Sequence, residues 1–138
     1  MKRVPAADGI SYENGLFSRE ETMRIILACA AGMSTSLLAN NMKKVAEDRN
    51  LDVTIDAMST SALDEAQWRS ADVVLVGPQM RHLLEPLVQE GDKYHVPVAA
   101  IPPQDYALAN GQHVLEQAYT LVENQAFHKD AGQPYHPL

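Results

Sequence analysis

Cysteine is nearly absent from this 138-residue sequence, which contains Cys29 and no other. A single thiol can form neither an internal disulfide nor a zinc site made of several thiolates, so a disulfide-stapled domain is excluded and a reducing compartment is the simplest setting. Positive charge is also scarce, because 11 Lys and Arg residues face 18 Asp and Glu residues and leave a net charge of −7. This balance argues against binding to nucleic acids or to an anionic membrane.

Long apolar runs are missing as well. No stretch approaches the roughly 20 apolar residues of a transmembrane helix, and residues 1–22 contain no apolar core of signal-peptide length. We therefore expect a cytoplasmic protein. The nucleotide-binding motifs G-x-G-x-x-G and G-x-x-x-x-G-K-[ST] are absent, and the five histidines show no metal-ligand spacing, so we expect no cofactor and no metal site.

What the sequence does contain is a regular alternation of short apolar segments with amphipathic ones. The predicted strands span residues 23–30, 51–58, 71–76 and 96–101, and the predicted helices lie within residues 34–49, 59–70, 79–90 and 109–125. Three of the four strands lack polar alternation, which is typical of strands buried on both faces of a parallel sheet. The order predicts one doubly wound α/β domain, with a four-stranded parallel sheet in the order 2-1-3-4 and helices on both faces.

The length of the chain suits one such domain and is too short for two. We expect residues 1–22 to form a flexible N-terminal arm, residues 23–125 the domain, and residues 126–138 a C-terminal tail.

Two of the predicted helices have irregular features. The short helix within residues 59–70 is expected to be capped by Thr60 or Ser61. Its expected inward face is formed by Ala62, Leu63 and Ala66. Trp68 is out of phase with that face, and we expect it to cover either the end of the helix or an edge of the sheet. Pro86 lies within the predicted helix 79–90, which indicates a kink or a late helix start.

The first predicted strand ends in Cys29, directly before a segment of small and hydroxyl residues that opens the next helix. The segment consists of Ala30, Ala31, Gly32, Met33, Ser34, Thr35 and Ser36. In doubly wound folds, ligands bind outside the carboxyl ends of the strands. Small side chains let the backbone wrap around an anion, the amides of the helix N-terminus attract it, and the hydroxyl groups add donors. The segment therefore predicts a phosphate-binding loop with a thiol at its base.

The helix N-terminus would also act on the thiol. A cysteine with a pKa of about 8.5 is mostly protonated at neutral pH, and a helix N-terminus can lower that pKa by several units. Cys29 is therefore a candidate phosphocysteine, whose phosphate the loop amides would hold. From the spacing alone, a buried cysteine that only fills the core explains the pattern equally well.

Three segments of the sequence carry a resemblance to a known family. They are MRIILACAAGMSTSLL at residues 23–38, ADVVLVGPQMRHLL at residues 71–84, and the fourth predicted strand with the loop that contains Tyr106. From residue 23 to about residue 123, the chain resembles the enzyme IIB component of the lactose/cellobiose (chitobiose) family of the bacterial phosphoenolpyruvate-dependent sugar phosphotransferase system. The match is most specific where the cysteine is followed closely by G-M-S-T-S.

The resemblance implies that the protein is a phosphoryl carrier, a phosphotransferase component with a phosphocysteine intermediate. Cys29 would accept phosphate from a phosphohistidine of a IIA protein and pass it to a sugar bound by the IIC membrane permease. The protein would be cytoplasmic and would associate with the membrane only transiently, through IIC. The family's sugar specificity is not expected to be written in this domain, so the resemblance does not choose the sugar.

Four residues at the ends of the third and fourth predicted strands are predicted to contact these protein partners. They are Gly77, Pro78, Gln79 and Tyr106. The Gly-Pro pair has a simpler alternative interpretation, because this dipeptide commonly ends a strand.

The resemblance also implies the fold of the low-molecular-weight tyrosine phosphatases, whose loop has the motif C-x5-R-S. A hydrolase of that kind, with Cys29 as nucleophile, is the alternative function. In this sequence Thr35 stands at the arginine position and Ser36 at the serine position. An arginine would grip the phosphoryl oxygens in the transition state, so its absence favours a carrier. Asp105 lies about where those phosphatases keep their acid, but an exposed loop aspartate or a cap of the last helix is the simpler interpretation.

Overall fold

The computed structural model describes residues 22–30 and 35–130. Its strands are β1 (Met23–Cys29), β2 (Val53–Ser59), β3 (Val73–Val76) and β4 (Val98–Ala100). Its helices are α1 (Ser36–Asp48), α2 (Glu65–Ser70), α3 (Leu84–Lys93), α4 (Pro103–Ala107) and α5 (Gly111–Asp130), with the 3-10 turns η2 (Thr60–Ala62) and η3 (Pro78–Leu83) before α2 and α3. Of the predicted arm and tail, residues 1–21 and 131–138 lie outside the described residues.

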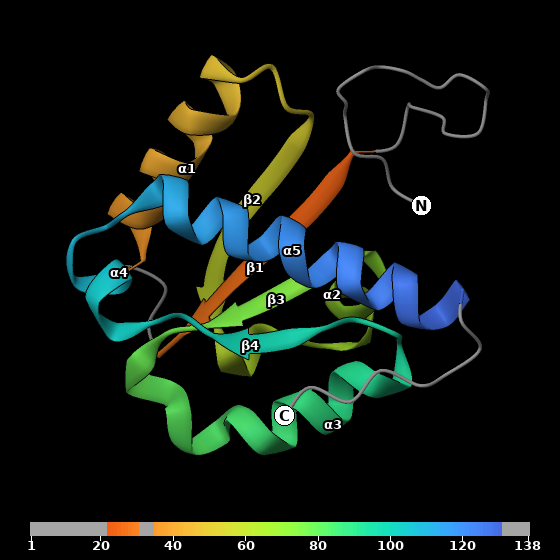
Figure 1. Cartoon of the computed structure of the whole chain (residues 1–138). Helices are drawn as coiled ribbons and strands as arrows, with labels where there is room; N and C mark the ends of the chain where they lie inside the picture. The colour runs from red at the N-terminus through yellow and green to blue at the C-terminus, as the bar shows by residue number, and fades with distance from the viewer. Residues whose placement is uncertain (1–21, 31–34, 131–138) are drawn as a thin grey trace.

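The strands form one parallel sheet in the order β2-β1-β3-β4, which confirms the predicted fold class (Figure 1). Because parallel strands point the same way, their last residues meet at one edge of the sheet. The ends of the four strands are Cys29, Ser59, Val76 and Ala100. We call this the carboxyl edge. Within it Cys29 pairs in register with Ser59 of the neighbouring strand.

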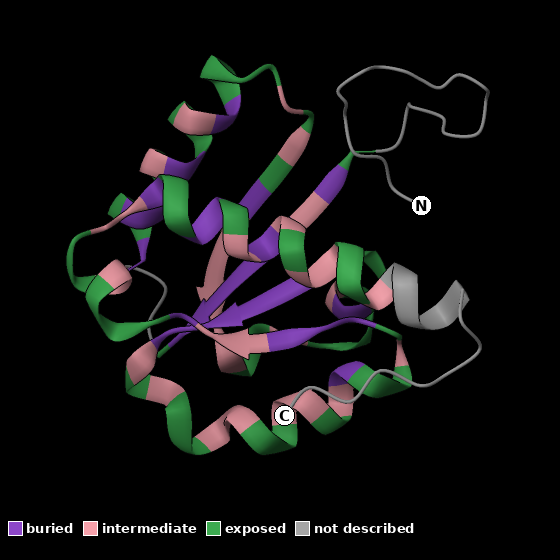
Figure 2. Cartoon of the chain, in the orientation of Figure 1, coloured by how far each residue is buried: buried purple, intermediate pink, exposed green. Residues whose placement is uncertain are grey.

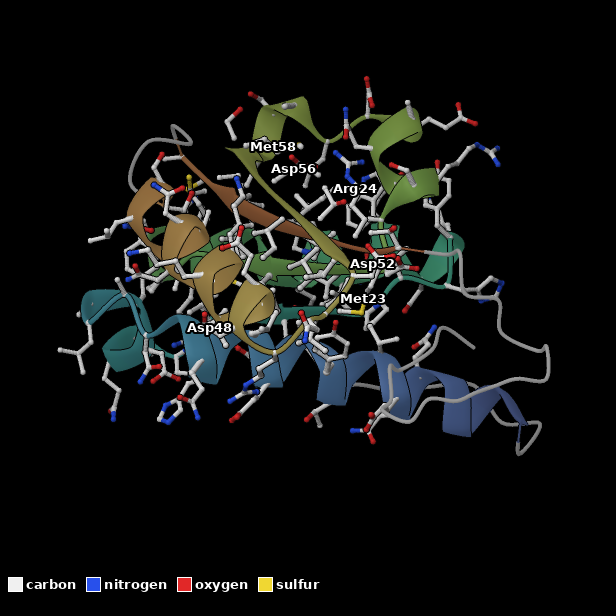
Figure 3. The ribbon with its side chains drawn as sticks, turned by 90° about the horizontal axis from the view of Figure 1, so that it is seen from above. Met23, Arg24, Asp48, Asp52, Asp56 and Met58 are labelled. Atoms are coloured by element: carbon white, nitrogen blue, oxygen red, sulfur yellow. The ribbon has the colours of Figure 1, made fainter. Side chains whose placement is uncertain are left out.

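Successive residues of β1 enter two separate cores, one on each face of the sheet. Ile25 and Leu27 pack with α1 and α5, whereas Ile26 and Ala28 pack with α2 and α3. Figure 2 shows the buried strands between the helices, and Figure 3 shows α1 and α5 on one side of the sheet and α2 on the other. A strand that is buried on both faces has no polar side, which explains the unbroken apolar run that begins at Ile25.

Arg24 is the charged exception in β1. Its Nε donates to Asp56 Oδ2 of β2 at 2.9 Å, and its guanidinium also donates to the Ser70 hydroxyl at the end of α2. Figure 3 shows Arg24 and Asp56 pointing toward each other from neighbouring strands. Arg24 lies near the start of β1, away from the carboxyl edge, so these contacts tie α2 to the sheet and take no part in the site described below.

The segment of residues 59–70 differs from the prediction in where its helix begins and which residue caps it. Thr60 and Ser61 lie in η2 and do not cap α2. The cap is Asp64, whose Oδ1 accepts a hydrogen bond from the backbone N–H of Gln67 at 3.0 Å. Asp is as good a capping residue as Ser or Thr, and the sequence contains all three within residues 60–64.

The later start also changes which side chains of this segment face the core. Ala62 and Ala66 are exposed, contrary to the prediction, and only Leu63 of the predicted inward face packs against the core. Trp68 is 2% exposed and stacks on Tyr94 of the neighbouring helix end, with ring centroids 6.2 Å apart. The six-residue helix that begins after Asp64 therefore turns its one large apolar side chain inward.

The remaining helices differ from the predictions mainly at their ends. Helix α3 begins at Leu84, so Pro86 lies in its first turn, where the missing N–H of proline is tolerated, and the predicted late start is confirmed. The predicted last helix begins at Gly111 and continues to Asp130, past the predicted boundary at residue 126. A separate helix, α4, precedes it and was not predicted. None of the helices within residues 22–30 and 35–130 is long and apolar enough to cross a membrane.

A close approach of α5 to α1 fixes the helix that starts at the carboxyl edge. A Cβ atom on Gly111 would lie 2.6 Å from the carbonyl carbon of Asn41 and 2.7 Å from the backbone nitrogen of Met42. Only a glycine therefore fits at this crossing. The Asn41 side chain adds a hydrogen bond from its Nδ2 to the Ala109 carbonyl at 2.8 Å. These contacts hold α1, and with it the residues that face Cys29, in a fixed place against the sheet.

Candidate functional site

Cys29 is the last residue of β1, and its side chain is fully buried at the carboxyl edge. The turn after β3 lies directly beside it, because Gly77 donates its backbone N–H to the Ala28 carbonyl at 2.8 Å. A Cβ atom on Gly77 would lie 3.5 Å from Cys29 Cβ. That distance is ordinary contact, and the atom nearest to such a Cβ would be Gln79 Oε1 at 2.9 Å, so Gly77 makes room for the Gln79 side chain.

Thr35 contacts the thiol. It stands at the N-cap position of α1, is fully buried, and places its Oγ1 3.5 Å from Cys29 Sγ. A threonine at an N-cap usually accepts a hydrogen bond from its own helix, but the Thr35 side chain makes no such bond. One of the predicted hydroxyl donors is thus in contact with the sulfur. Of the other predicted loop residues, Ala30 and Ser36 are exposed, and Ala31, Gly32, Met33 and Ser34 lie outside the described residues.

The described surroundings of Cys29 contain no negative charge that would repel an anion. Helix α1 begins at Ser36, and its first turn contains no acidic residue, so no carboxylate offsets the positive end of the helix dipole. The described residues next to Cys29 at the end of β2 and after β3 are Ser59, Gly77, Pro78 and Gln79, which carry no charge. An anion at this place, whether a thiolate or a phosphate, would therefore meet donors and a favourable dipole.

Two of the predicted partner-contact residues lie together. Gln79 Nε2 donates to the Tyr106 hydroxyl at 3.1 Å and so joins the turn after β3 to α4. Tyr106 is half-buried, and its ring packs against the core between the sheet, α1 and α5. Pro78, also half-buried, is the first residue of η3 in the same turn. These side chains form a polar rim at the carboxyl edge.

Asp105 has a partner that the sequence did not reveal. Its Oδ1 lies 3.1 Å from Nδ1 of His113, and its side chain is only 18% exposed. It is therefore neither an exposed loop residue nor the cap of α5, because that cap is Asn110, whose Oδ1 accepts the N–H of His113 at 3.1 Å. Asp105 and His113 are eight positions apart in the sequence and are separated by a turn between two helices, so no regular spacing signals the pair. No group of three or more metal-ligating side chains is found among the described residues.

Two exposed leucines near the site were not predicted from the sequence. Leu37 is 63% exposed in the first turn of α1, and Leu108 is 74% exposed directly after α4. Both elements lie at the end of the sheet to which the strand arrows point (Figure 1). Exposed leucines are common on protein surfaces, and only the place of their elements at the carboxyl end of the sheet distinguishes these two.

Comparison with known proteins gives a consistent result. A family model described as "PTS system, Lactose/Cellobiose specific IIB subunit" matches residues 24–117. The oligo-beta-mannoside-specific EIIB component of Bacillus subtilis is 41% identical over 74% of this chain and 98% of its own length. The cellobiose-specific EIIB component of Lactococcus lactis is 39% identical over 71% of this chain and 94% of its own length.

A solved structure agrees with these relatives. The cellobiose-specific phosphotransferase IIB component of Borrelia burgdorferi matches with a TM-score of 0.65 and 36% identity, over 76% of this chain and 95% of that one. The fold, the family model and the relatives therefore lead to one conclusion: the chain belongs to the lactose/cellobiose-specific IIB family and is a phosphotransferase component of a sugar phosphotransferase system.

Proposed function

We propose that Cys29 is the residue on which this IIB component carries its phosphoryl group. The observation that carries the proposal is the position of the sulfur, which is buried at the end of β1 between Gly77 and the start of α1. A thiolate there would attack the phosphorus of a phosphohistidine, forming the S–P bond while the N–P bond breaks and its electron pair returns to the imidazole. In the second step a sugar hydroxyl attacks, the S–P bond breaks, and its electron pair returns to sulfur. The hydroxyl proton leaves to solvent or to a base of the acceptor protein.

The loop from Ala30 to Ser36 would hold the phosphoryl oxygens between these two steps. Backbone amides at a helix N-terminus bind phosphate without a charged side chain, and the first turn of α1 brings no carboxylate to repel it. The loop as proposed consists of Ala30, Ala31, Gly32, Met33, Ser34, Thr35 and Ser36. A site of this kind stabilises the phosphocysteine more than the transition state of its hydrolysis, which suits a carrier.

The family implies IIA and IIC components as partners. We propose that the specific donor is a phosphorylated IIA protein and the specific acceptor a sugar-loaded IIC permease. Both must reach the same sulfur, so both would touch the polar rim of Pro78, Gln79 and Tyr106, with Gly77 behind it. The exposed Leu37 and Leu108 would add apolar contact area on either side. Relatives of nearly equal identity are named for oligo-beta-mannoside and for cellobiose, as expected if another component selects the sugar.

The experiment that tests this function is the mapping of the phosphorylated residue. The protein is incubated with labelled phosphoenolpyruvate, the general phosphotransferase proteins and a cognate IIA protein, and the labelled peptide is identified. We expect the label on Cys29 and we expect it to depend on IIA. Label on a histidine, of which His113 beside Asp105 is the first candidate, would remove the thiol from the mechanism.

We also expect the protein to be a poor phosphatase. Thr35 occupies the arginine position of the phosphatase motif and is fully buried, so no side chain from that position can clamp the transferring group. The loss of such a clamp slows the reaction by about 100-fold or more. Turnover of an aryl phosphate should therefore be at least about 100-fold slower than that of a C-x5-R enzyme assayed in parallel. Brisk turnover that disappears in Asp105→Asn would instead favour the hydrolase.

A further inference from the structure

The Thr35 side chain has a position that helix capping does not explain. Thr35 is the one polar residue that is fully buried among the described residues. Burying a hydroxyl group without a hydrogen bond would cost about 1–3 kcal/mol of folding free energy. At an N-cap it would ordinarily bond to its own helix, but no such bond is made, and Oγ1 lies 3.5 Å from Cys29 Sγ. The hydroxyl thus points toward the sulfur of Cys29 and does not cap α1.

The surroundings hold this pair together. Thr35 is β-branched, which restricts its χ1, and its carbonyl accepts the N–H of Ala39 at 2.8 Å in the first turn of α1. The end of β1 is also held by the turn after β3, because the N–H of Gly77 is bonded to the Ala28 carbonyl at 2.8 Å. Both the end of β1 and the residue that contacts the sulfur are therefore held in place by backbone hydrogen bonds.

A hydroxyl group at this distance can act in either protonation state of the sulfur. It accepts from a thiol S–H and donates to a thiolate, and hydrogen bonds to a charged group are roughly twice as strong as neutral ones. The bond therefore favours the thiolate over the thiol. The hydroxyl that contacts the sulfur thus belongs to Thr35, which stands at the arginine position of C-x5-R-S.

We propose that Thr35 is a positioning residue whose hydroxyl donates a hydrogen bond to the Cys29 sulfur whenever that sulfur carries negative charge. Before transfer, this bond holds the thiolate in place for attack on phosphorus. When the S–P bond breaks and the electron pair returns to sulfur, the same bond stabilises the leaving thiolate. Thr35 keeps its proton throughout, so no proton is transferred by it. The role in transfer rests on the proposed function of Cys29, whereas the bond to the thiolate does not.

The test uses the fact that the chain contains one thiol, so any thiolate signal comes from Cys29. Thr35→Val keeps the volume and removes the hydroxyl, and Thr35→Ser keeps the hydroxyl and removes the methyl group. We measure the ultraviolet absorbance of the thiolate as a function of pH, together with the rate of IIA-dependent phosphorylation. In Thr35→Val the midpoint of the titration should rise by about one pH unit and the rate should fall about tenfold. Thr35→Ser should restore both.

The two readouts separate the possible failures. If Thr35→Val titrates like the parent, the inference is wrong and Thr35 only packs against the thiol, whatever the rate of transfer. If the midpoint rises as expected but no label reaches Cys29, the hydrogen bond stands and the proposed function fails. If valine prevents folding, the comparison of Thr35→Ala with Thr35→Ser tests the same hydroxyl, and equal midpoints in that pair would overturn the inference.

Discussion

Cys29→Ser should lose phosphoryl transfer by about 1,000-fold or more while the protein remains folded. A serine hydroxyl is almost entirely protonated at neutral pH, and the described residues beside Cys29 offer the uncharged Thr35 hydroxyl but no base to activate it. The change removes little volume, and the new hydroxyl can bond to Thr35, so the fold should survive. The measurement is transfer of label from phosphorylated IIA, with thermal unfolding recorded on the same samples.

A second variant separates the nucleophile from the shape of its pocket. Cys29→Ala lacks both the thiol and the hydroxyl, and it should be as inactive as Cys29→Ser if only the thiolate can be phosphorylated. Full transfer by either variant would show that Cys29 only fills the core. The phosphorylated residue would then have to be a different one, such as a histidine.

Gly91→Ala should destabilise the protein strongly, although it adds only one methyl group. A Cβ atom at this position in α3 would lie 2.5 Å from the Val96 carbonyl oxygen, 2.7 Å from Val98 Cγ2 and 3.2 Å from Trp68 Cζ3. The carbonyl cannot retreat easily, because the N–H of Val96 is bonded to the Gly91 carbonyl at 2.9 Å. At an exposed helix position, Gly→Ala would raise the free energy of unfolding by about 1 kcal/mol. Because of these close contacts, we expect Gly91→Ala to lower it by about 2–3 kcal/mol.

Urea unfolding measures this effect, and the same helix provides a control. Gln89 is exposed two residues earlier, and Gln89→Ala should change the free energy of unfolding by no more than about 0.5 kcal/mol. If Gly91→Ala is as stable as the parent protein, α3 can move away from β4 and the close packing around Trp68 is not required.

The sheet could be predicted because its physics is local and repetitive. A strand buried on both faces must be apolar at every position, so Ile25, Ile26 and Leu27 indicate both the strand and its central place in the sheet. Cys29 could be placed at the carboxyl edge because the apolar run that predicts the strand ends there. These conclusions needed no knowledge of which residues touch across the fold.

The packing of α2 could not be predicted in the same way, since it depends on one choice between equal capping residues. Thr60, Ser61 and Asp64 are all good caps, and only the structure shows that Asp64 is used. The choice moves the helix start and decides that Trp68 is buried. Helix α4 does have a signal in the sequence, because its first residue is Pro103 and proline is favoured at the first position of a helix.

The side-chain contacts of the site were beyond the sequence for a different reason. Whether the Thr35 hydroxyl caps its helix or faces the sulfur depends on the relative placement of β1 and α1, which the crossing at Gly111 determines from far along the chain. The Asp105–His113 pair likewise depends on how α4 turns into α5. Such contacts depend on the tertiary structure. A sequence pattern can therefore indicate which residues belong to the site but not which of them contact each other.

The outer strands of the sheet have a consequence for how the protein meets other proteins. β4 has only three residues, and β2 carries the charged Asp56 in its middle, with Arg24 bound to it from the neighbouring strand. Short or charged outer strands discourage a second chain from adding its own strand to a sheet. A carrier that must bind and release two partners in turn would be trapped by such intermolecular strand addition. Outer strands of this kind therefore favour brief contacts through side chains, as we propose for the carboxyl edge.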